Sequence, residues 1–125
     1  MPAEFLPALE VAGRLLLGGV FVFAGWRNIG AFATLVPLIG ARGMPMPKLM
    51  LSVAIALQVI AGVLVIAGVW LAPAAIALIG FLIVATLLFH NFWDHQGLDR
   101  VNRINGLTSN VALIGSFLLV MVVAN

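Results

Sequence analysis

Four side chains that carry charge or form strong hydrogen bonds lie inside long apolar stretches of this sequence. They are Arg14, Gln58, His90 and Asn110. Such groups are costly in an apolar surrounding and usually face other protein groups or a ligand, so each is a candidate ligand-binding residue. His90 and Asp94 are also four residues apart, a helical spacing that suits a proton relay. These residues therefore indicate two kinds of chemistry, ligand binding and proton transfer.

The stretch around Arg14 has one helical face of glycine, aromatic and polar residues. Intervals of four and three residues fall on one side of a helix, and here they join Glu10, Arg14, Gly18, Phe21, Gly25 and Asn28. Glycines let a neighbouring helix approach closely, so this face is expected to point inward with Arg14 on it. Glu10 is the expected ion-pair partner of Arg14. We favour a structural role for Arg14, in joining helices or reaching the headgroups, over a chemical one.

Gln58 lies near the middle of the second apolar stretch, on a face of small residues that is expected to pack against another helix. This position predicts an interhelical hydrogen bond. A ligand contact is the alternative, and proton transfer is excluded because glutamine does not titrate. The glycines expected to support helix packing are Gly18, Gly25, Gly62 and Gly115.

The third apolar stretch ends in aromatic and titratable residues. Trp93 fits the aromatic belt found where a membrane meets water. His90 and His95 are five residues apart and cannot share a helical face, so no metal site is expected. His90 is expected to form a hydrogen bond inside the protein and, like Trp93, to contact a ligand headgroup. Asn110 points away from the small-residue face of the last stretch, and its partner stays open.

The composition determines the solvent that surrounds these residues. Of the 125 residues, 64% are hydrophobic and 8% are charged, and the mean hydropathy is +1.24. A soluble domain has about a quarter charged residues with which to cover its surface, so this chain is expected to face lipid. Its net charge of +2 is the balance of six Lys and Arg against four Asp and Glu. The expected partners of the basic residues are anionic lipid headgroups, not nucleic acid.

One domain of four spans accounts for residues 1–125, since a span takes about 20 residues. The expected spans are residues 9–29, 49–71, 73–93 and 106–124. The loop 30–48 is expected to hold a short interfacial helix, and Pro73 to open the third span. Glu4 and Glu10 precede the apolar run from Leu15 to Ala24, where a signal peptide would carry positive charge, so the first span is expected to be retained and not cleaved. The predicted fold is an all-α integral membrane protein, a four-transmembrane-helix antiparallel bundle.

Five of the six basic residues lie at one end of this arrangement: Arg27, Arg42, Lys48, Arg100 and Arg103. The positive-inside rule then predicts that loops 30–48 and 94–105 are cytoplasmic and that both termini are outside.

Several of these motifs resemble the DoxX family of small four-span bacterial membrane proteins, over nearly the whole chain. They are the opening helix from Arg14 to Arg27, the Gly43-Met-Pro-Met-Pro47 loop, the motif His90-x-Phe92-Trp93, and the segment Asn110–Gly115. Two positions depart from the family pattern. Gln58 stands where the family commonly has a glutamate, and Ser109 where it commonly has a lysine. Both departures remove charge and weaken any proton- or anion-linked role at these positions.

The resemblance implies a bacterial inner-membrane protein related to subunits of quinone-linked redox complexes. We expect an accessory or anchoring subunit with a quinone or lipid groove between helices and other membrane or peripheral subunits as partners. No cofactor is firmly implied, a quinone being the one candidate, and no catalytic activity is expected of the chain on its own. The alternative is a catalytic, quinone-interacting subunit that uses His90 and Asp94. A small transporter ranks last, because no span contains an internal proline.

Overall fold

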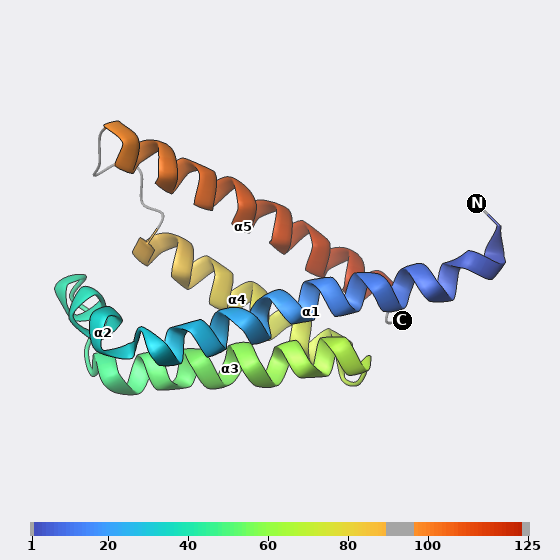
Figure 1. Cartoon of the computed structure of the whole chain (residues 1–125), viewed down its shortest axis with the longest axis horizontal. Helices are drawn as coiled ribbons and strands as arrows, with labels where there is room; N and C mark the ends of the chain where they lie inside the picture. The colour runs from blue at the N-terminus through green and yellow to red at the C-terminus, as the bar shows by residue number, and fades with distance from the viewer. Residues whose placement is uncertain (1, 90–96, 124–125) are drawn as a thin grey trace.

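The computed structural model describes residues 2–89 and 97–123, and these residues are almost entirely helical. They form a short 3-10 helix, η1 (Ala3–Phe5), and the helices α1 (Leu6–Gly30), α2 (Phe32–Ala41), α3 (Pro47–Ala67), α4 (Leu71–Phe89) and α5 (Gly97–Val123) (Figure 1). Helices α1, α3, α4 and α5 are long and apolar enough to cross a membrane. The prediction of an all-α membrane protein with four spanning helices is confirmed.

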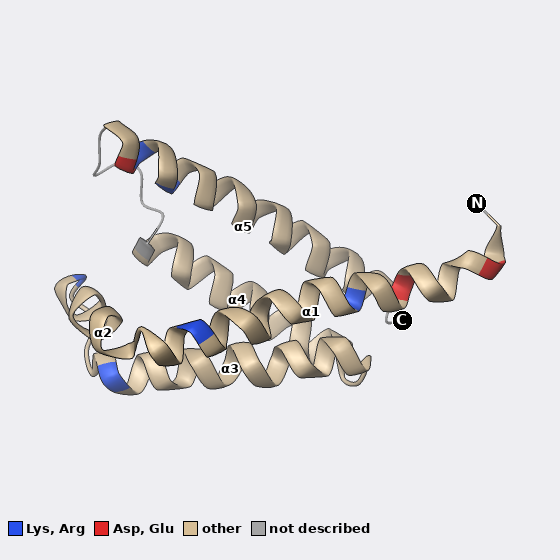
Figure 2. Cartoon of the chain, in the orientation of Figure 1, with Lys and Arg blue, Asp and Glu red and all other residues tan. Residues whose placement is uncertain are grey.

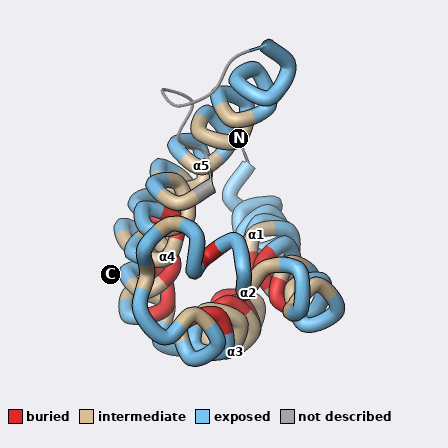
Figure 3. Tube along the Cα trace, turned by 90° about the vertical axis from the view of Figure 1, so that its left-hand side faces the viewer, coloured by how far each residue is buried: buried red, intermediate tan, exposed pale blue. Residues whose placement is uncertain are grey.

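The long helices pack in the order α1, α3, α4, α5. Helices α1 and α3 lie side by side along most of their length, whereas α5 packs on α4 and leans away from α1 (Figures 1 and 3). Phe21 of α1 spans this opening, with its ring 5.4 Å from that of Phe117 on α5 and 6.4 Å from that of Phe81 on α4. The bundle is therefore open between its first and last helices and joined there by aromatic side chains.

A small core lies where the four long helices come closest. Its largest fully buried side chains are Val65, Leu78 and Phe117. Figure 3 shows that buried residues occur as narrow stripes, bordered by intermediate and exposed residues. The exposed side chains are largely apolar, as with Leu16 and Leu119. Such a surface is stable in lipid and not in water.

The turn between α3 and α4 differs from the prediction. Helix α3 ends at Ala67, not at Leu71, and α4 begins at Leu71, ahead of Pro73. Gly68 ends α3 because it adopts a left-handed conformation (φ 74°), and the N–H of Val69 donates to the carbonyl oxygen of Leu64. This is the usual glycine-based helix ending, and it precedes the proline that we expected to set the boundary.

The last helix is also longer than predicted. Helix α5 begins at Gly97, inside the expected polar loop 94–105, and not at residue 106. The carboxylate of Asp99 in its first turn favours helix formation, because it faces the positive end of the helix dipole. Asp99 also pairs with Arg103 one turn later, at 3.4 Å. Polar residues ended the apolar pattern there, but they did not end the helix.

Helix α2 occupies the segment in which a short interfacial helix was expected, and it packs on α3 through the buried side chain of Ile39. The loop that follows contains two residues with positive φ, Gly43 and Met46. The position of α2 relative to the bilayer stays a prediction.

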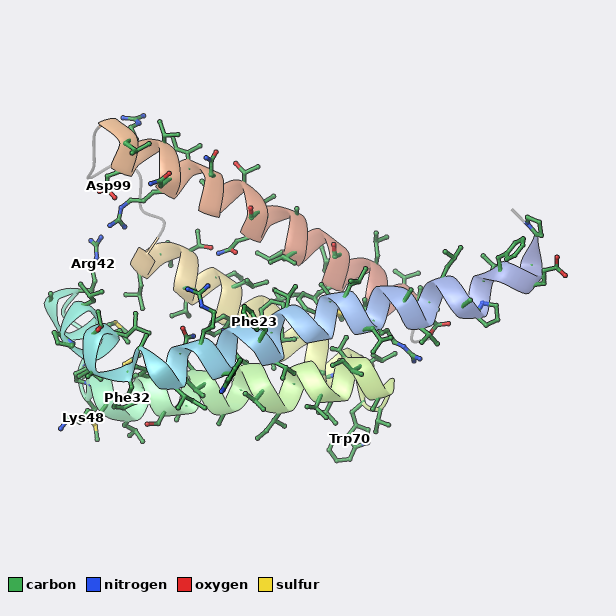
Figure 4. The ribbon with its side chains drawn as sticks, in the orientation of Figure 1. Phe23, Phe32, Arg42, Lys48, Trp70 and Asp99 are labelled. Atoms are coloured by element: carbon green, nitrogen blue, oxygen red, sulfur yellow. The ribbon has the colours of Figure 1, made fainter. Side chains whose placement is uncertain are left out.

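Charged residues gather at the two ends of the bundle (Figure 2). One end has the last turn of α1, helix α2 and the starts of α3 and α5, with Arg27, Arg42, Lys48, Arg100 and Arg103; we call it the basic end. The opposite end has the turn 68–70, Glu10 and Arg14; we call it the turn end. The 21 residues of α3 measure about 31 Å, close to the hydrocarbon thickness of about 30 Å. Lys48 and Trp70, at opposite ends of α3 (Figure 4), therefore mark the two edges of the expected membrane slab.

Candidate ligand-binding pocket

The candidate site depends on a close approach of α1 to α3. A Cβ atom added to Gly18 would lie 2.5 Å from the carbonyl oxygen of Gly62, and one added to Gly62 would lie 2.8 Å from that of Gly18. A Cβ at Gly25 would lie 2.6 Å from Cγ2 of Val59. Only glycine fits at these positions, as expected from the sequence, and the two backbones come nearly into contact.

Two amides meet across this contact. The Nδ2 group of Asn28 on α1 donates a hydrogen bond of 2.9 Å to Oε1 of Gln58 on α3. Gln58 is 3% exposed and is the one fully buried polar residue in the described part of the chain. The interhelical hydrogen bond expected for Gln58 is present. Bonds of this kind contribute about 0.6 kcal/mol on average in membrane proteins, so this one adds precision to the α1–α3 contact more than stability.

A pocket of about 330 Å³ lies beside this amide pair at the basic end. We call it the basic-end pocket. Four helices line it: α1 with Asn28, α2 with Leu35 and Ile39, α3 with Met50, Leu51 and Ala54, and α4 with Phe81, Val84, Ala85 and Leu88. Asn28 supplies the only polar side chain among these lining residues, and none of them is titratable. The pocket is suited to an apolar molecule with one hydrogen-bonding group.

Asn110 forms a second amide contact, between α4 and α5. Its Nδ2 group donates a hydrogen bond of 2.9 Å to Oγ1 of Thr86. The sequence left this partner open, since a threonine in an apolar helix has no distinctive pattern. Asn110 is not among the residues that line the basic-end pocket, so its contact joins helices and does not complete the site.

Arg14 lies at the turn end and does not contribute to the basic-end pocket. Its Nη1 atom is 3.8 Å from Oε1 of Glu10, the expected partner. The guanidinium lies directly against Gly68, where a Cβ would collide with it. This places a cation beside the C-terminus of α3, where the helix dipole favours positive charge. The geometry supports the structural role expected for Arg14.

Two other expected residues cannot be placed in the same way. His90 and Trp93, like the alternative proton-relay partner Asp94, lie outside the described residues. The expected ligand set therefore separates into Gln58 beside the pocket, Arg14 at the turn end, Asn110 between α4 and α5, and two residues that stay predictions.

The helix-packing role predicted for Gly115 is wrong. This residue was expected to support helix packing, but it is exposed and an added Cβ would meet nothing within 4 Å. Helix α5 instead turns Phe117 toward the core, together with Leu113 and Ile114. Helix α5 makes its contact through large side chains because a Phe ring fills the space between α5 and its neighbours. Burying that ring stabilises the fold far more than a close contact at a glycine would.

Comparison with known proteins agrees with this architecture. The family description DoxX matches residues 9–91, well over half of the chain. The chain belongs to the DoxX family. It is also 30% identical over 118 residues to "Inner membrane protein YphA" of Escherichia coli (strain K12), covering 93% of this chain and 83% of that protein. No solved structure matches the chain. Together with the four apolar helices, these matches make it a multi-pass protein of the bacterial inner membrane.

The main feature of the site, the basic-end pocket with its apolar walls, was not predicted from the sequence. Asn28 was placed on the inward face of α1, but its bond to Gln58 depends on the register between two helices. The pocket residues Leu35, Met50 and Leu88 carry no pattern that separates them from lipid-facing residues. Among the residues at this site, only Gln58 could be singled out from the sequence, because it is an amide inside an apolar span.

Proposed function

We propose that this DoxX protein is an accessory subunit of a membrane redox complex and that its basic-end pocket holds the headgroup of a quinone. The observation that carries the proposal is the amide of Asn28 at the wall of an apolar pocket. An amide nitrogen has two N–H groups, and Gln58 takes one of them. The second is available to a quinone carbonyl oxygen, which is an acceptor, while the apolar walls suit the ring.

An accessory role agrees with the chemistry of the lining residues. Quinone reduction consumes protons, and a catalytic site needs a group that supplies them. The described residues that line the pocket include no acid and no base. The pocket therefore supports binding, and a partner subunit of the complex supplies electrons and protons. Gln58, where the family pattern has glutamate, agrees with this role because an amide stays neutral.

The test measures binding of a short-chain quinone analogue to the full chain in lipid nanodiscs, by isothermal titration calorimetry. We expect saturable binding at one site. Asn28→Leu removes the donor and should weaken binding about tenfold, since a hydrogen bond of about 1.4 kcal/mol corresponds to that factor. The matched control is Asn110→Leu, which breaks another interhelical bond of 2.9 Å outside the pocket lining and should leave binding within about twofold.

Two results would contradict the proposal. The first is quinone binding that is absent from the wild-type chain or equal in the Asn28 and Asn110 variants. The second is turnover: if the purified chain alone reduces the quinone from a soluble electron donor, the accessory role is wrong and the catalytic alternative holds.

A further inference from the structure

The opening between α1 and α5 contains a second hollow, at the turn end. Its volume is about 530 Å³, and we call it the turn-end groove. One wall is α1 from Leu9 to Val20, and the other is α5 from Leu113 to Val123. In Figure 1 these two helices diverge from this end toward the basic end. None of the groove-lining residues borders the basic-end pocket.

The groove has the length of one leaflet. Leu9 and Val20 are eleven residues apart, which corresponds to about 16 Å of helix. Half of a hydrocarbon core of about 30 Å is about 15 Å. The groove reaches the level of Gly68, against which Arg14 lies, and Gly68 ends the span α3. From Arg14 to Val20 the groove therefore runs about 9 Å into the leaflet, and its part from Leu9 to Gly13 extends beyond the end of α3.

The walls of the groove suit a hydrocarbon chain. Most of the lining residues are leucine or valine, and methylene groups pack against such side chains at carbon–carbon distances of about 4 Å. The single hydroxyl in the walls, that of Ser116, donates to the carbonyl oxygen of Ala112, so the walls are apolar apart from Glu10 and Arg14.

Opposite charges stand beside this apolar groove. Glu10 and Arg14 both line it, and their side chains are 44% and 21% exposed. Their separation of 3.8 Å is longer than a strong charged hydrogen bond of about 2.8 Å. The Nε atom of Arg14 is buried with no hydrogen-bond partner among the described residues. The pair therefore has capacity left for an acceptor at Arg14 and for a cation at Glu10.

We propose that the turn-end groove binds one zwitterionic phospholipid, with an acyl chain between α1 and α5, its phosphate at Arg14 and its ammonium group at Glu10. The match of charges selects a headgroup with both signs over a purely anionic one. The exposed part of the Arg14 side chain can donate to a phosphate oxygen. The lipid fills the opening that α5 leaves beside α1 and holds the two helices at a fixed distance. This site is independent of the quinone proposal.

The experiment is native mass spectrometry of the full chain, delipidated in detergent and titrated with phosphatidylethanolamine or phosphatidylglycerol of the same acyl chains. We expect one phosphatidylethanolamine per chain, bound at least fivefold more tightly than phosphatidylglycerol. Gly13→Leu places a side chain in the groove and should weaken lipid binding at least tenfold. Its control is Gly80→Leu on α4. A Cβ meets nothing within 4 Å at either glycine, so both variants should fold.

A second variant tests the headgroup assignment. Glu10→Gln removes the negative partner and should reverse the preference toward phosphatidylglycerol. The proposal is overturned if Gly13→Leu binds lipid like the wild-type chain, or if the wild-type chain shows no headgroup preference. It is also overturned if the delipidated chain is a dimer that Gly13→Leu dissociates, because a second copy then occupies the groove.

Discussion

The contact between Gly18 and Gly62 offers the sharpest test of how α1 and α3 are held together. In the substitution Gly18→Ala, the new methyl carbon would lie 2.5 Å from the Gly62 carbonyl oxygen and 3.1 Å from the Ile66 nitrogen. A carbon needs about 3.3 Å from a carbonyl oxygen, so α1 must move away by about 0.8 Å. These two atoms belong to the backbone and cannot rotate aside, unlike Cγ1 of Ile66, which would lie 2.7 Å away. Overpacking of this kind costs about 1–3 kcal/mol.

The neighbouring residue is a matched control. Gly19 lies in the same turn of α1, and a Cβ there meets nothing within 4 Å. Both substitutions gain the same helix propensity of about 0.5–1 kcal/mol. This term cancels in the comparison, so the difference in unfolding free energy between the two variants is the overpacking cost alone. Gly19→Ala should be more stable than the wild-type chain, and Gly18→Ala less stable than Gly19→Ala by about 1–3 kcal/mol.

The assay is reversible unfolding of the purified chain in mixed micelles, titrated with a denaturing detergent and followed by tryptophan fluorescence. A double substitution adds a check on mechanism. Gly62→Ala inserts its methyl group into the same contact, so Gly18→Ala and Gly62→Ala together should cost less than the sum of the two alone. The reasoning is refuted if Gly18→Ala unfolds at the same detergent fraction as Gly19→Ala, or later.

Two further substitutions test the turn and the last helix. Gly68→Ala should destabilise the chain more than Gly43→Ala. Both residues have positive φ and an alanine there incurs about 1–2 kcal/mol of backbone strain, but only at Gly68 does the new methyl group collide with the Arg14 guanidinium. Equal melting temperatures of the two variants would contradict this. Phe117→Ala should lower the unfolding free energy by about 3–5 kcal/mol, because Phe117 is fully buried. Leu119 lies on the exposed side of α5, so Leu119→Ala should change the unfolding free energy by less than about 0.5 kcal/mol. A comparable loss at Leu119 would mean that α5 packs through another face.

Much of the fold could be predicted because lipid imposes a simple pattern on sequence. A span must be apolar for about 20 residues, and an inward face in a membrane favours small residues. These two requirements identified the four helices, the glycine face of α1 and the interhelical bond of Gln58. They act within a single helix, so they can be read without knowing its neighbours.

The errors arose where a result depends on local backbone geometry or on a neighbouring helix. The glycine ending at Gly68 preceded the more conspicuous Pro73, and polar residues such as Asp99 continued α5 beyond its apolar part. Gly115 was placed on a packing face because small residues were assumed to face inward, whereas α5 is held by Phe117. The lining of the basic-end pocket could not be read at all, since its apolar residues have the same composition as those that face lipid.

The most direct test of the proposed function is photoaffinity labelling with an azido-quinone in native membranes, followed by mapping of the labelled residues by mass spectrometry. We expect label at the end of α1, the start of α3 and the end of α4, around Asn28, Met50 and Leu88. Excess unlabelled quinone should abolish this label. Label that spreads over the lipid-facing surface and resists competition, or that gathers in the turn-end groove, would contradict it.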